Sequence, residues 1–275
     1  MSADFAEANP LRLVLLIFIP ALILAALIGI SRAAGTSHYV IDGAEGELLY
    51  AASFDGDSLD GFNDEWEQYQ GRQDSQIVDG VMRLHLSESY DSLYSLTRRR
   101  FGDFDLRVQG RATAGPLDNG YGVIFRLQDR NNYYLFLVSS DGYYSVVRVL
   151  NGEYKELSTW IATTTPTPEL EGLTVSTGLN VINEIRVLAR GSTFEFYVNG
   201  LRAPLCIPNN PDGTSTYYEF FETPEERCVQ GQIVSSLTDD SIPAGQLGVV
   251  VQSFEMPEGV FDLSVEFDNL LVYGA

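Results

Sequence analysis

Asx-Gly pairs set between β-branched and aromatic residues are the feature that most constrains the fold of this chain. Between Gly120 and Tyr154 the strand-like runs are interrupted by an Asn-Asn pair, by Asp141-Gly142 and by Asn151-Gly152. Two-residue Asx-Gly turns require positive φ angles and match the twist of paired strands, so they predict β-hairpins. Similar punctuation recurs at Asp79-Gly80, Arg190-Gly191 and Asn199-Gly200. The sequence therefore predicts an antiparallel all-β protein.

The strand-like runs are spaced mostly about eight to twelve residues apart, which is typical of a β-sandwich held as one domain. No segment after residue 46 shows sustained helical periodicity, so we expect one sandwich over residues 46–275. The runs are Glu47–Phe54, Glu65–Tyr69, Val81–Leu86, Ser92–Thr97, Phe104–Thr113, Tyr121–Gln128, Tyr133–Ser139, Tyr143–Leu150, Val181–Ala189, Thr193–Val198, Gln246–Gln252 and Val260–Tyr273.

Two segments interrupt this rhythm. Residues 158–178 are rich in Thr and Pro and predict an exposed loop. Residues 205–243 form an insertion where a short connection would be expected, and they contain both cysteines, Cys206 and Cys228. Because there is no other cysteine, we expect a disulfide, which would restrain a long loop.

The net charge of −21 bears on the choice of partner. Lys155 is the only lysine, and the other basic residues are arginines. So acidic a chain repels polyanions, which argues against a nucleic-acid partner. The same net charge would keep an exported domain soluble. Two histidines without cysteine-histidine spacing give no basis for a zinc or haem site.

An apolar run precedes the sandwich. Residues 13–30 are 18 uninterrupted apolar residues between Arg12 and Arg32, long enough as a helix to span roughly 27 Å. We expect a tail at residues 1–12, a transmembrane helix at 13–31 and a tether at 32–45 that holds the sandwich close to the bilayer. The alternative is a cleaved signal peptide, although its apolar region is usually shorter.

The two cysteines indicate on which side of the membrane the β-domain lies. Arg12 and Arg32, which flank the apolar run, favour opposite orientations and do not decide it. A disulfide and an all-β domain suit an oxidising compartment. We therefore expect a single-pass cell-membrane protein with the β-domain outside the cytoplasm.

Longer stretches resemble the concanavalin-like lectin/glucanase jelly roll, and most closely its laminin-G-like and 3-keto-disaccharide hydrolase types on bacterial surfaces. The resembling residues are 101–112, 119–144, 180–200, 245–251 and 265–273. The resemblance implies a jelly-roll sandwich, but this fold hosts lectins, glycosidases and scaffolding domains alike.

The laminarinase branch of this fold uses two carboxylates in a Glu-x-Asp-x-x-Glu motif on one strand. The nearest match here, Glu266-Phe267-Asp268, lacks the third glutamate. His85 lies between two leucines in a strand and is expected to be a structural residue. We therefore expect no catalytic residues.

Aromatic and arginine residues on the central hairpins are candidates for a glycan surface, because rings stack on sugars and arginine fixes hydroxyl groups. The alternative is that most of these aromatic residues fill the core. The candidate ligand residues are Arg126, Tyr134, Tyr144, Arg148 and Trp160.

Oxygen-bearing side chains near the two ends of the sandwich resemble a structural calcium site of some relatives, with a solvated acidic turn as the alternative. The candidate ligands are Asp55, Asp57, Asp268 and Asn269.

The insertion also carries an aromatic cluster suited to a protein partner, since aromatic anchors dominate interface energies. The alternative is that the cluster packs back onto the sandwich. Its members are Tyr217, Tyr218, Phe220 and Phe221.

Taken as a whole, the sequence predicts a membrane-anchored, non-catalytic binding domain for a glycan or an envelope protein. One alternative is an accessory subunit whose helix packs in a membrane complex. The other is a glycoside-processing enzyme of the 3-keto-disaccharide hydrolase type.

Overall fold

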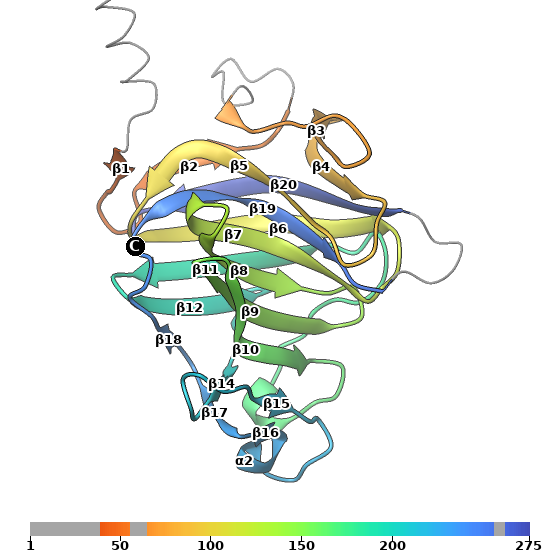
Figure 1. Ribbon diagram of the computed structural model, residues 1–275, viewed down its shortest axis with the longest axis vertical. Helices are drawn as coiled ribbons and strands as arrows, with labels where there is room; N and C mark the ends of the chain where they lie inside the picture. The colour runs from red at the N-terminus through yellow and green to blue at the C-terminus, as the bar shows by residue number, and fades with distance from the viewer. Residues whose placement is uncertain (1–38, 56–64, 256–261) are drawn as a thin grey trace, which may run out of the picture. The chain divides into compact units, whose positions relative to one another are not determined.

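The computed structural model describes residues 39–55, 65–255 and 262–275, and within them the chain is an all-β sandwich. Figure 1 shows two layered sheets, with short strands and one helical turn at the bottom of the view. One sheet has the order β1 (Val40–Ile41), β5 (Ser92–Phe101), β19 (Gly245–Ser253), β7 (Asn119–Asp129), β8 (Asn132–Val138), β9 (Tyr143–Leu150) and β10 (Glu153–Ala162).

The second sheet has the order β13 (Leu201–Arg202), β12 (Thr193–Val198), β11 (Asn183–Arg190), β6 (Phe104–Ala114), β20 (Leu263–Tyr273), β4 (Val81–Leu86) and β3 (Asp74–Val78). Two further strands join it, β18 (Leu237–Thr238) beside β12 and β2 (Leu48–Ala52) beside β20. All the pairings in both sheets are antiparallel except that of β1 with β5, which is parallel. We call the two sheets the seven-stranded and the nine-stranded sheet.

The predicted hairpin turns are present. Asn151 has φ 53° and Gly152 has φ 83°, so both residues between β9 and β10 are in the left-handed region that a tight hairpin needs. Asp79-Gly80 and Asn199-Gly200 share this pattern. The predicted run Glu65–Tyr69 differs, because it forms only isolated bridges, of Trp66 with Thr97 and of Tyr69 with Ser75.

The core lies between the sheets and is rich in aromatic rings. The Phe125 ring stacks on that of Tyr134, with centroids 5.3 Å apart, and meets Phe194 edge-on at 5.6 Å. Fully burying one such side chain contributes about 2–3 kcal/mol. This interface between the sheets is therefore the main source of the sandwich's stability.

The seven-stranded sheet is apolar on its other face as well. Along β7, Val123 and Phe125 point into the core, whereas Ile124 between them belongs to a separate apolar cluster. We call this the outer cluster, and Tyr94, Tyr133 and Trp160 pack against it. Its buried members are Leu96, Ile124, Leu127, Leu135, Leu137, Val147 and Val250.

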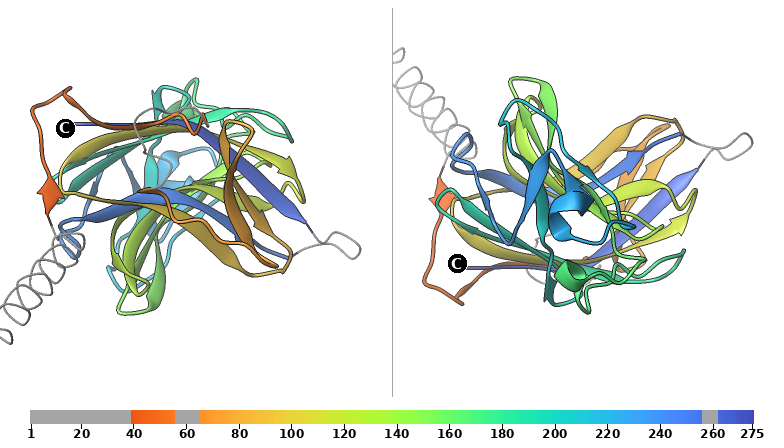
Figure 2. Two further views of the ribbon diagram at one scale, coloured as in Figure 1. Left: turned by 90° about the horizontal axis from the view of Figure 1, so that it is seen from above. Right: turned by 90° about the horizontal axis from the view of Figure 1, so that it is seen from below.

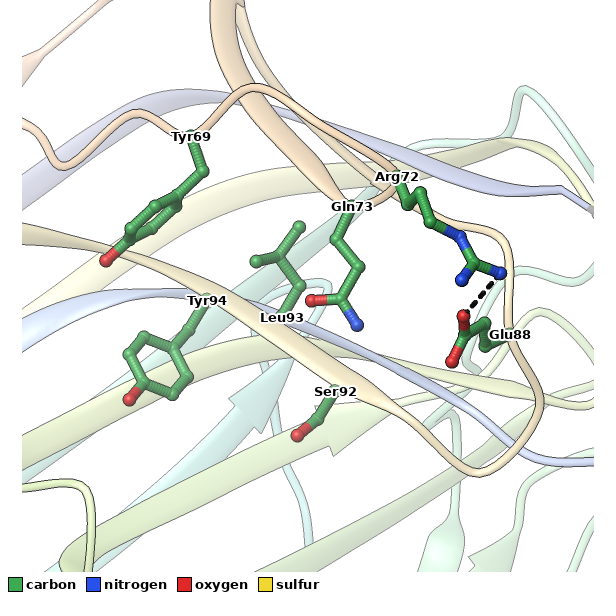
Figure 3. Close-up of a pocket in the computed structure, with 7 residues that line it drawn as sticks. All are labelled: Tyr69, Arg72, Gln73, Glu88, Ser92, Leu93 and Tyr94. Carbon is green, nitrogen blue, oxygen red and sulfur yellow. Dashed lines mark ion pairs between the residues drawn. The ribbon is translucent and has the colours of Figure 1, made fainter.

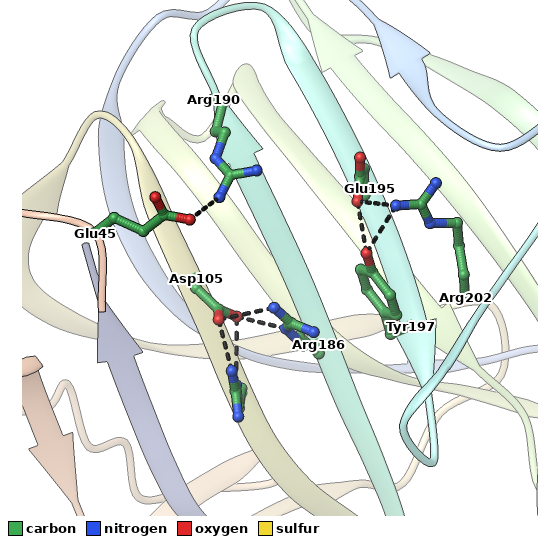
Figure 4. Close-up of polar contacts among 8 residues, drawn as sticks. Glu45, Asp105, Arg186, Arg190, Glu195, Tyr197 and Arg202 are labelled. Carbon is green, nitrogen blue, oxygen red and sulfur yellow. Dashed lines mark hydrogen bonds and ion pairs between the residues drawn. The ribbon is translucent and has the colours of Figure 1, made fainter. Parts of the chain in front are cut away.

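By contrast, the outer face of the nine-stranded sheet carries ion pairs. Figure 4 shows Asp105 on β6 facing the guanidinium group of Arg186 on β11, which binds it at 2.6 Å. Arg107 binds the same carboxylate at 2.7 Å. Glu266 on β20 is shared in the same way by Arg83 and Arg111, each at 2.8 Å.

The insertion has a structure of its own that is fastened to the sandwich. It contains β14 (Leu205–Pro208) paired with β17 (Gly231–Val234), β15 (Thr216–Tyr217) paired with β16 (Cys228–Val229), and helix α2 (Pro224–Arg227). Figure 2 shows it in front in the view from below. The predicted disulfide between Cys206 and Cys228 is present, and both cysteines pack in the core cluster.

The predicted loop at residues 158–178 is only partly a loop. Strand β10 continues to Ala162, and a 3₁₀ turn η2 covers Pro168–Leu170. Leu173 and Val175 are buried in the main core. The Thr/Pro content of this segment predicted an exposed loop. The burial of Leu173 and Val175 holds the segment against the core instead, because the free energy gained by burying apolar side chains outweighs the local preference for exposure.

Within the described residues, none of the helices has the length and apolar character needed to cross a bilayer. The predicted transmembrane helix at residues 13–31 lies outside them, as do the tail and residues 32–38 of the tether. The helix therefore stays a prediction.

Candidate functional site

A cavity of about 310 Å³ opens at one end of the seven-stranded sheet, and we call it the Trp160 pocket. Four elements meet there: the start of β7, the turn between β8 and β9, the end of β10 and the segment after β19. Antiparallel pairing brings these ends together, because Tyr121 pairs with Val138, Val138 with Tyr144 and Tyr144 with Ile161. The lining residues are Asp118, Asn119, Ser139, Asp141, Tyr143, Trp160 and Phe254.

Aromatic rings form one side of the pocket. Trp160 points outward from β10, because its neighbour Ile161 points into the core. Its ring stands perpendicular to that of Phe254, with centroids 5.7 Å apart. Trp160 also packs against the outer cluster, which holds it in place. The indole is therefore a fixed apolar surface beside a cavity.

Two carboxylates form the other side. Asn119 fixes the loop of Asp118: its amide donates to the Pro116 carbonyl at 2.6 Å and to Ser140 Oγ at 3.0 Å. The Ser139 hydroxyl donates to Asp141, and the Tyr143 amide donates to that hydroxyl oxygen at 2.9 Å. Asp118 and Asp141 therefore lie in loops that hydrogen bonds hold against the seven-stranded sheet.

The carboxylates influence each other and their aromatic neighbour. Partial burial raises the pKa of Asp118, and the charge of Asp141 raises it further. The pKa of Tyr143 is raised by burial, then by Glu219 of the insertion, Asp141 and Asp118. One carboxylate oxygen of Glu219 is buried without a hydrogen-bond partner among the described residues. Negative charge therefore accumulates around this pocket.

A second cavity, of about 670 Å³, opens beside strand β5. Figure 3 shows the rings of Tyr69 and Tyr94 on one side of it and the ion pair between Arg72 and Glu88, at 2.7 Å, on the other. The Tyr94 ring lies 6.4 Å from that of Tyr133, at the margin of the outer cluster. Gln73, Ser92 and Leu93 complete its lining.

Of the five predicted ligand residues, only Trp160 lines a pocket among those described here. Arg126 is 1% exposed, and its guanidinium donates to the carbonyls of Gly102, Gly191 and Ile242 at 3.0, 2.7 and 3.1 Å. It also lies over the Phe194 ring at 4.7 Å. This arginine therefore holds three loops together from inside the sandwich.

The other three are also engaged internally. Tyr134 and Tyr144 are buried, and their hydroxyl groups donate to Asp239 at 2.6 Å and to the Pro204 carbonyl at 2.5 Å. Arg148 donates to the same Asp239 at 2.6 Å. Asp239 of the insertion and the Pro204 carbonyl just before it therefore bind the polar groups that the sequence suggested for sugar binding. We do not assign these three residues to the site.

The residues that come nearest to a catalytic motif, for which the sequence analysis expected no catalytic role, have partners within the fold. Glu266 is held by two arginines, Phe267 is buried in the core, and His85 lies 3.0 Å from the Ser264 hydroxyl. Each therefore has a structural role.

Of the predicted calcium ligands, Asp55 and Asp268 do approach each other. The pKa of Asp268 is raised by burial, and the charge of Asp55 contributes to the shift. The Asn269 amide donates to Asp268 at 3.2 Å, and Asp57 lies outside the described residues. The described part of the chain has no group of three or more acidic, histidine or cysteine residues arranged to hold a metal ion. Calcium therefore stays a prediction.

The aromatic cluster of the insertion divides in two. Tyr217 is buried, and its hydroxyl donates to Glu169 at 2.9 Å. Tyr218 and Phe221 are exposed and meet edge-on at 5.5 Å, and Phe220 is 85% exposed. Only these three are therefore available to a partner.

Sequence reasoning missed Asp118, Asn119, Ser139, Asp141 and Phe254 as a group. The available signal was the register of the hairpins, since turns at alternate strand ends lie on the same edge of an antiparallel sheet. Phe254 carried no local signal, because β19 joins β7 only through the tertiary fold.

Comparison with known proteins shows the family of this chain. A family model described as a 3-keto-alpha-glucoside-1,2-lyase-like domain matches residues 50–213, more than half of the chain. The chain belongs to this family. The resemblance to the 3-keto-disaccharide hydrolase type that the sequence analysis stated is therefore confirmed. In the comparison with curated proteins, none matches this chain.

Solved structures share the fold of this lyase-like domain. A Bacillus subtilis protein described as having a galectin-like fold matches with TM-score 0.50 and 10% identity, over 84% of this chain and 97% of that one. A glycosidic hydrolase matches with TM-score 0.50 and 13% identity, over 85% and 99%. A carbohydrate-binding module, CBM66 from Bacillus subtilis, matches with TM-score 0.46 and 16% identity, over 76% and 95%. At these identities the likeness is one of fold alone.

Proposed function

We propose that this protein is a membrane-anchored, non-catalytic glycan-binding protein whose ligand occupies the Trp160 pocket. The observation that carries the proposal is the pairing of Trp160 and Phe254 with two loop carboxylates, Asp118 and Asp141, around one cavity. The family and the jelly-roll fold support a sugar as the ligand.

The chemistry of the pocket suits a sugar. The apolar C–H face of a pyranose packs on an aromatic ring, and sugar hydroxyl groups donate hydrogen bonds to carboxylates. Asn119 and the two serines that fix the loops hold these acceptors in position before a ligand arrives. Such preorganisation lowers the entropic cost of binding.

The cellular setting of the proposal rests on the apolar run at residues 13–30 and on the disulfide. We place the domain outside the cytoplasm, close to a bacterial cell membrane, because disulfides persist in oxidising compartments. From that position it would meet envelope glycans.

The test is glycan-array binding followed by titration of any hit with matched variants. Trp160→Ala is expected to abolish binding, and Trp160→Phe to retain part of it. The control is Tyr154→Ala, which removes an exposed ring of the same strand that does not line the pocket. If Trp160→Ala and Tyr154→Ala bind alike, the pocket is not the glycan site.

A second candidate function is glycoside processing at the same pocket. The presence of Asp118 and Asp141 at one cavity favours it, because most glycosidases use two carboxylates, and burial together with Asp141 raises the pKa of Asp118 in the direction that a general acid needs. Turnover of oligosaccharides or 3-keto-glucosides that Asp118→Asn abolishes would establish it. Binding without turnover would leave the non-catalytic assignment standing.

A third candidate is contact with an envelope protein, or membership of a membrane complex, through the insertion. The exposed rings of Tyr218, Phe220 and Phe221 favour it, since exposed aromatic clusters mark interfaces. Pull-down in mild detergent with Phe220→Ser as the comparison tests it: a stoichiometric partner that this variant loses would support the assignment.

A further inference from the structure

The Trp160 pocket has an excess of negative charge. None of the described residues that line it is basic, and two of them are carboxylates. Its aromatic members are Tyr143, Trp160 and Phe254, and the π electrons of aromatic rings attract cations. The lining therefore favours a positively charged group, to which the two carboxylates offer hydrogen-bond acceptors.

Two further acceptors nearby lack donors. One oxygen of Glu219 is buried without a partner, and its charge acts on Tyr143. The side-chain oxygen of Gln252 is also buried without a partner. Gln252 precedes Phe254 by two residues on β19 and lies beside Gly120 at the start of β7. Neither residue lines the pocket, but both add acceptors to its surroundings, and unsatisfied buried acceptors are costly.

We propose that the Trp160 pocket selects sugars that carry a free, protonated amino group over neutral, N-acetylated or acidic sugars. This inference rests on the proposed glycan-binding function and specifies its ligand class. An ammonium group has three donors and no acceptor, which complements the two carboxylates. It also relieves the repulsion between Asp118 and Asp141 and is attracted to the aromatic rings of the lining.

The size of the cavity favours a sugar unit over a protein segment. At about 310 Å³ it lies at the small end of the range for ligand pockets, which is about 300–1,000 Å³. An acidic sugar would bring its carboxylate against Asp118 and Asp141, and N-acetylation would remove the charge and add bulk. Both changes oppose binding.

The experiment is calorimetric titration of the full-length chain in mildly acidic, low-salt buffer. The three probes are an oligomer of glucosamine, one of N-acetylglucosamine and one of glucose. We expect the glucosamine oligomer to bind about tenfold more tightly or better, because charge-assisted hydrogen bonds are roughly twice as strong as neutral ones. Added salt should weaken this binding and leave binding of the glucose oligomer unchanged.

Variants of the pocket test the preference for amino sugars separately from the proposed glycan-binding function. Asp118→Asn and Asp141→Asn should bring the preference for glucosamine close to one, and should weaken binding of the glucose oligomer less, because an amide oxygen still accepts a hydrogen bond from a hydroxyl group. Glu153→Gln, an exposed acid at the other end of β10, should leave the preference intact.

Three results would overturn the proposal. Equal affinity for all three oligomers, lost with Trp160→Ala, would refute the amino-sugar preference and leave the glycan-binding function standing. An unchanged preference for glucosamine in both Asp118→Asn and Asp141→Asn would show that the charge of these carboxylates does not set the preference. Binding of a lysine-rich peptide and of no sugar would overturn both proposals.

Discussion

The hydroxyl group of Tyr134 donates a 2.6 Å hydrogen bond to Asp239, which ties the middle of the seven-stranded sheet to the end of the insertion. Arg148 binds the same carboxylate at 2.6 Å. Burial alone would raise the pKa of Asp239, but its hydrogen bonds, first that of Tyr134, hold the pKa below its usual value. Two residues that looked like sugar ligands are thus partners of one structural acid.

Replacing Asp239 by alanine should therefore lower the free energy of unfolding by about 2–4 kcal/mol, because a buried hydroxyl and a partly buried guanidinium lose their acceptor. Denaturant unfolding measures this. Asp240→Ala is the matched control, an exposed acid next in sequence, and should change stability little. Equal effects of the two substitutions would contradict the role assigned to Asp239.

Arg126 should behave as a core residue. Arg126→Met leaves the carbonyls of Gly102, Gly191 and Ile242 without their donor, so we expect a loss of about 3 kcal/mol or more. Arg98→Met, at an exposed position of β5, is the control. Thermal unfolding gives the comparison. Glycan binding by folded Arg126→Met should match that of the parent, and selective loss of binding would return Arg126 to the ligand site.

The nine-stranded sheet should make the protein sensitive to acid. Burial would raise the pKa of Glu266, but Arg83 and Arg111 hold it below the usual value. A carboxyl group with a lower pKa when folded binds more protons unfolded. Its stabilisation is therefore complete above the unfolded pKa of about 4.3 and is lost as the pH falls through the folded pKa.

The free energy of unfolding should accordingly fall on acidification from neutral pH. Glu266→Gln should be less stable at neutral pH and lose less stability on acidification. Denaturant titrations over a pH series measure both slopes. Parallel slopes for parent and variant would show that Glu266 does not contribute to the acid dependence.

The disulfide should stabilise the insertion and the sandwich together, because both cysteines pack in the core cluster. Cys206→Ala with Cys228→Ala is expected to cost about 3 kcal/mol, the constraint expected for a loop of this length. Reductant should lower the melting temperature of the parent and leave the double variant unchanged. Alkylation of both cysteines in the unreduced parent would contradict the bond.

Deleting residues 207–229 should also lower stability. The sequence suggested that this segment is separable, but Tyr217 is buried and Glu169 binds Arg227 at 2.7 Å. The deletion would expose part of the core and leave Glu169 unpaired. Circular dichroism with a melting curve measures the loss, and a deleted form as stable as the parent would show that the insertion only decorates the sandwich.

The sequence by itself determined the class of fold and much of its order. Turns such as Asn151-Gly152 and Asn199-Gly200 are local, because positive φ at both positions selects a tight hairpin whatever the distant contacts. The runs of β-branched and aromatic residues between such turns predicted most of the strands, and two cysteines without competitors predicted the disulfide.

Only the tertiary structure decided which side chains face a ligand. The pattern of β7 and β8 is apolar on both faces, so sequence could not tell the core face of Tyr134 from an outer, ligand-facing one. Arg126 looked exposed because its three carbonyl partners lie in loops far apart in sequence. The Trp160 pocket likewise depends on β10 and the end of β19 meeting across the sheet, a contact of Trp160 with Phe254 that no local pattern encodes. Local conformation depends on neighbouring residues, whereas the surroundings of a polar or aromatic side chain depend on distant pairing.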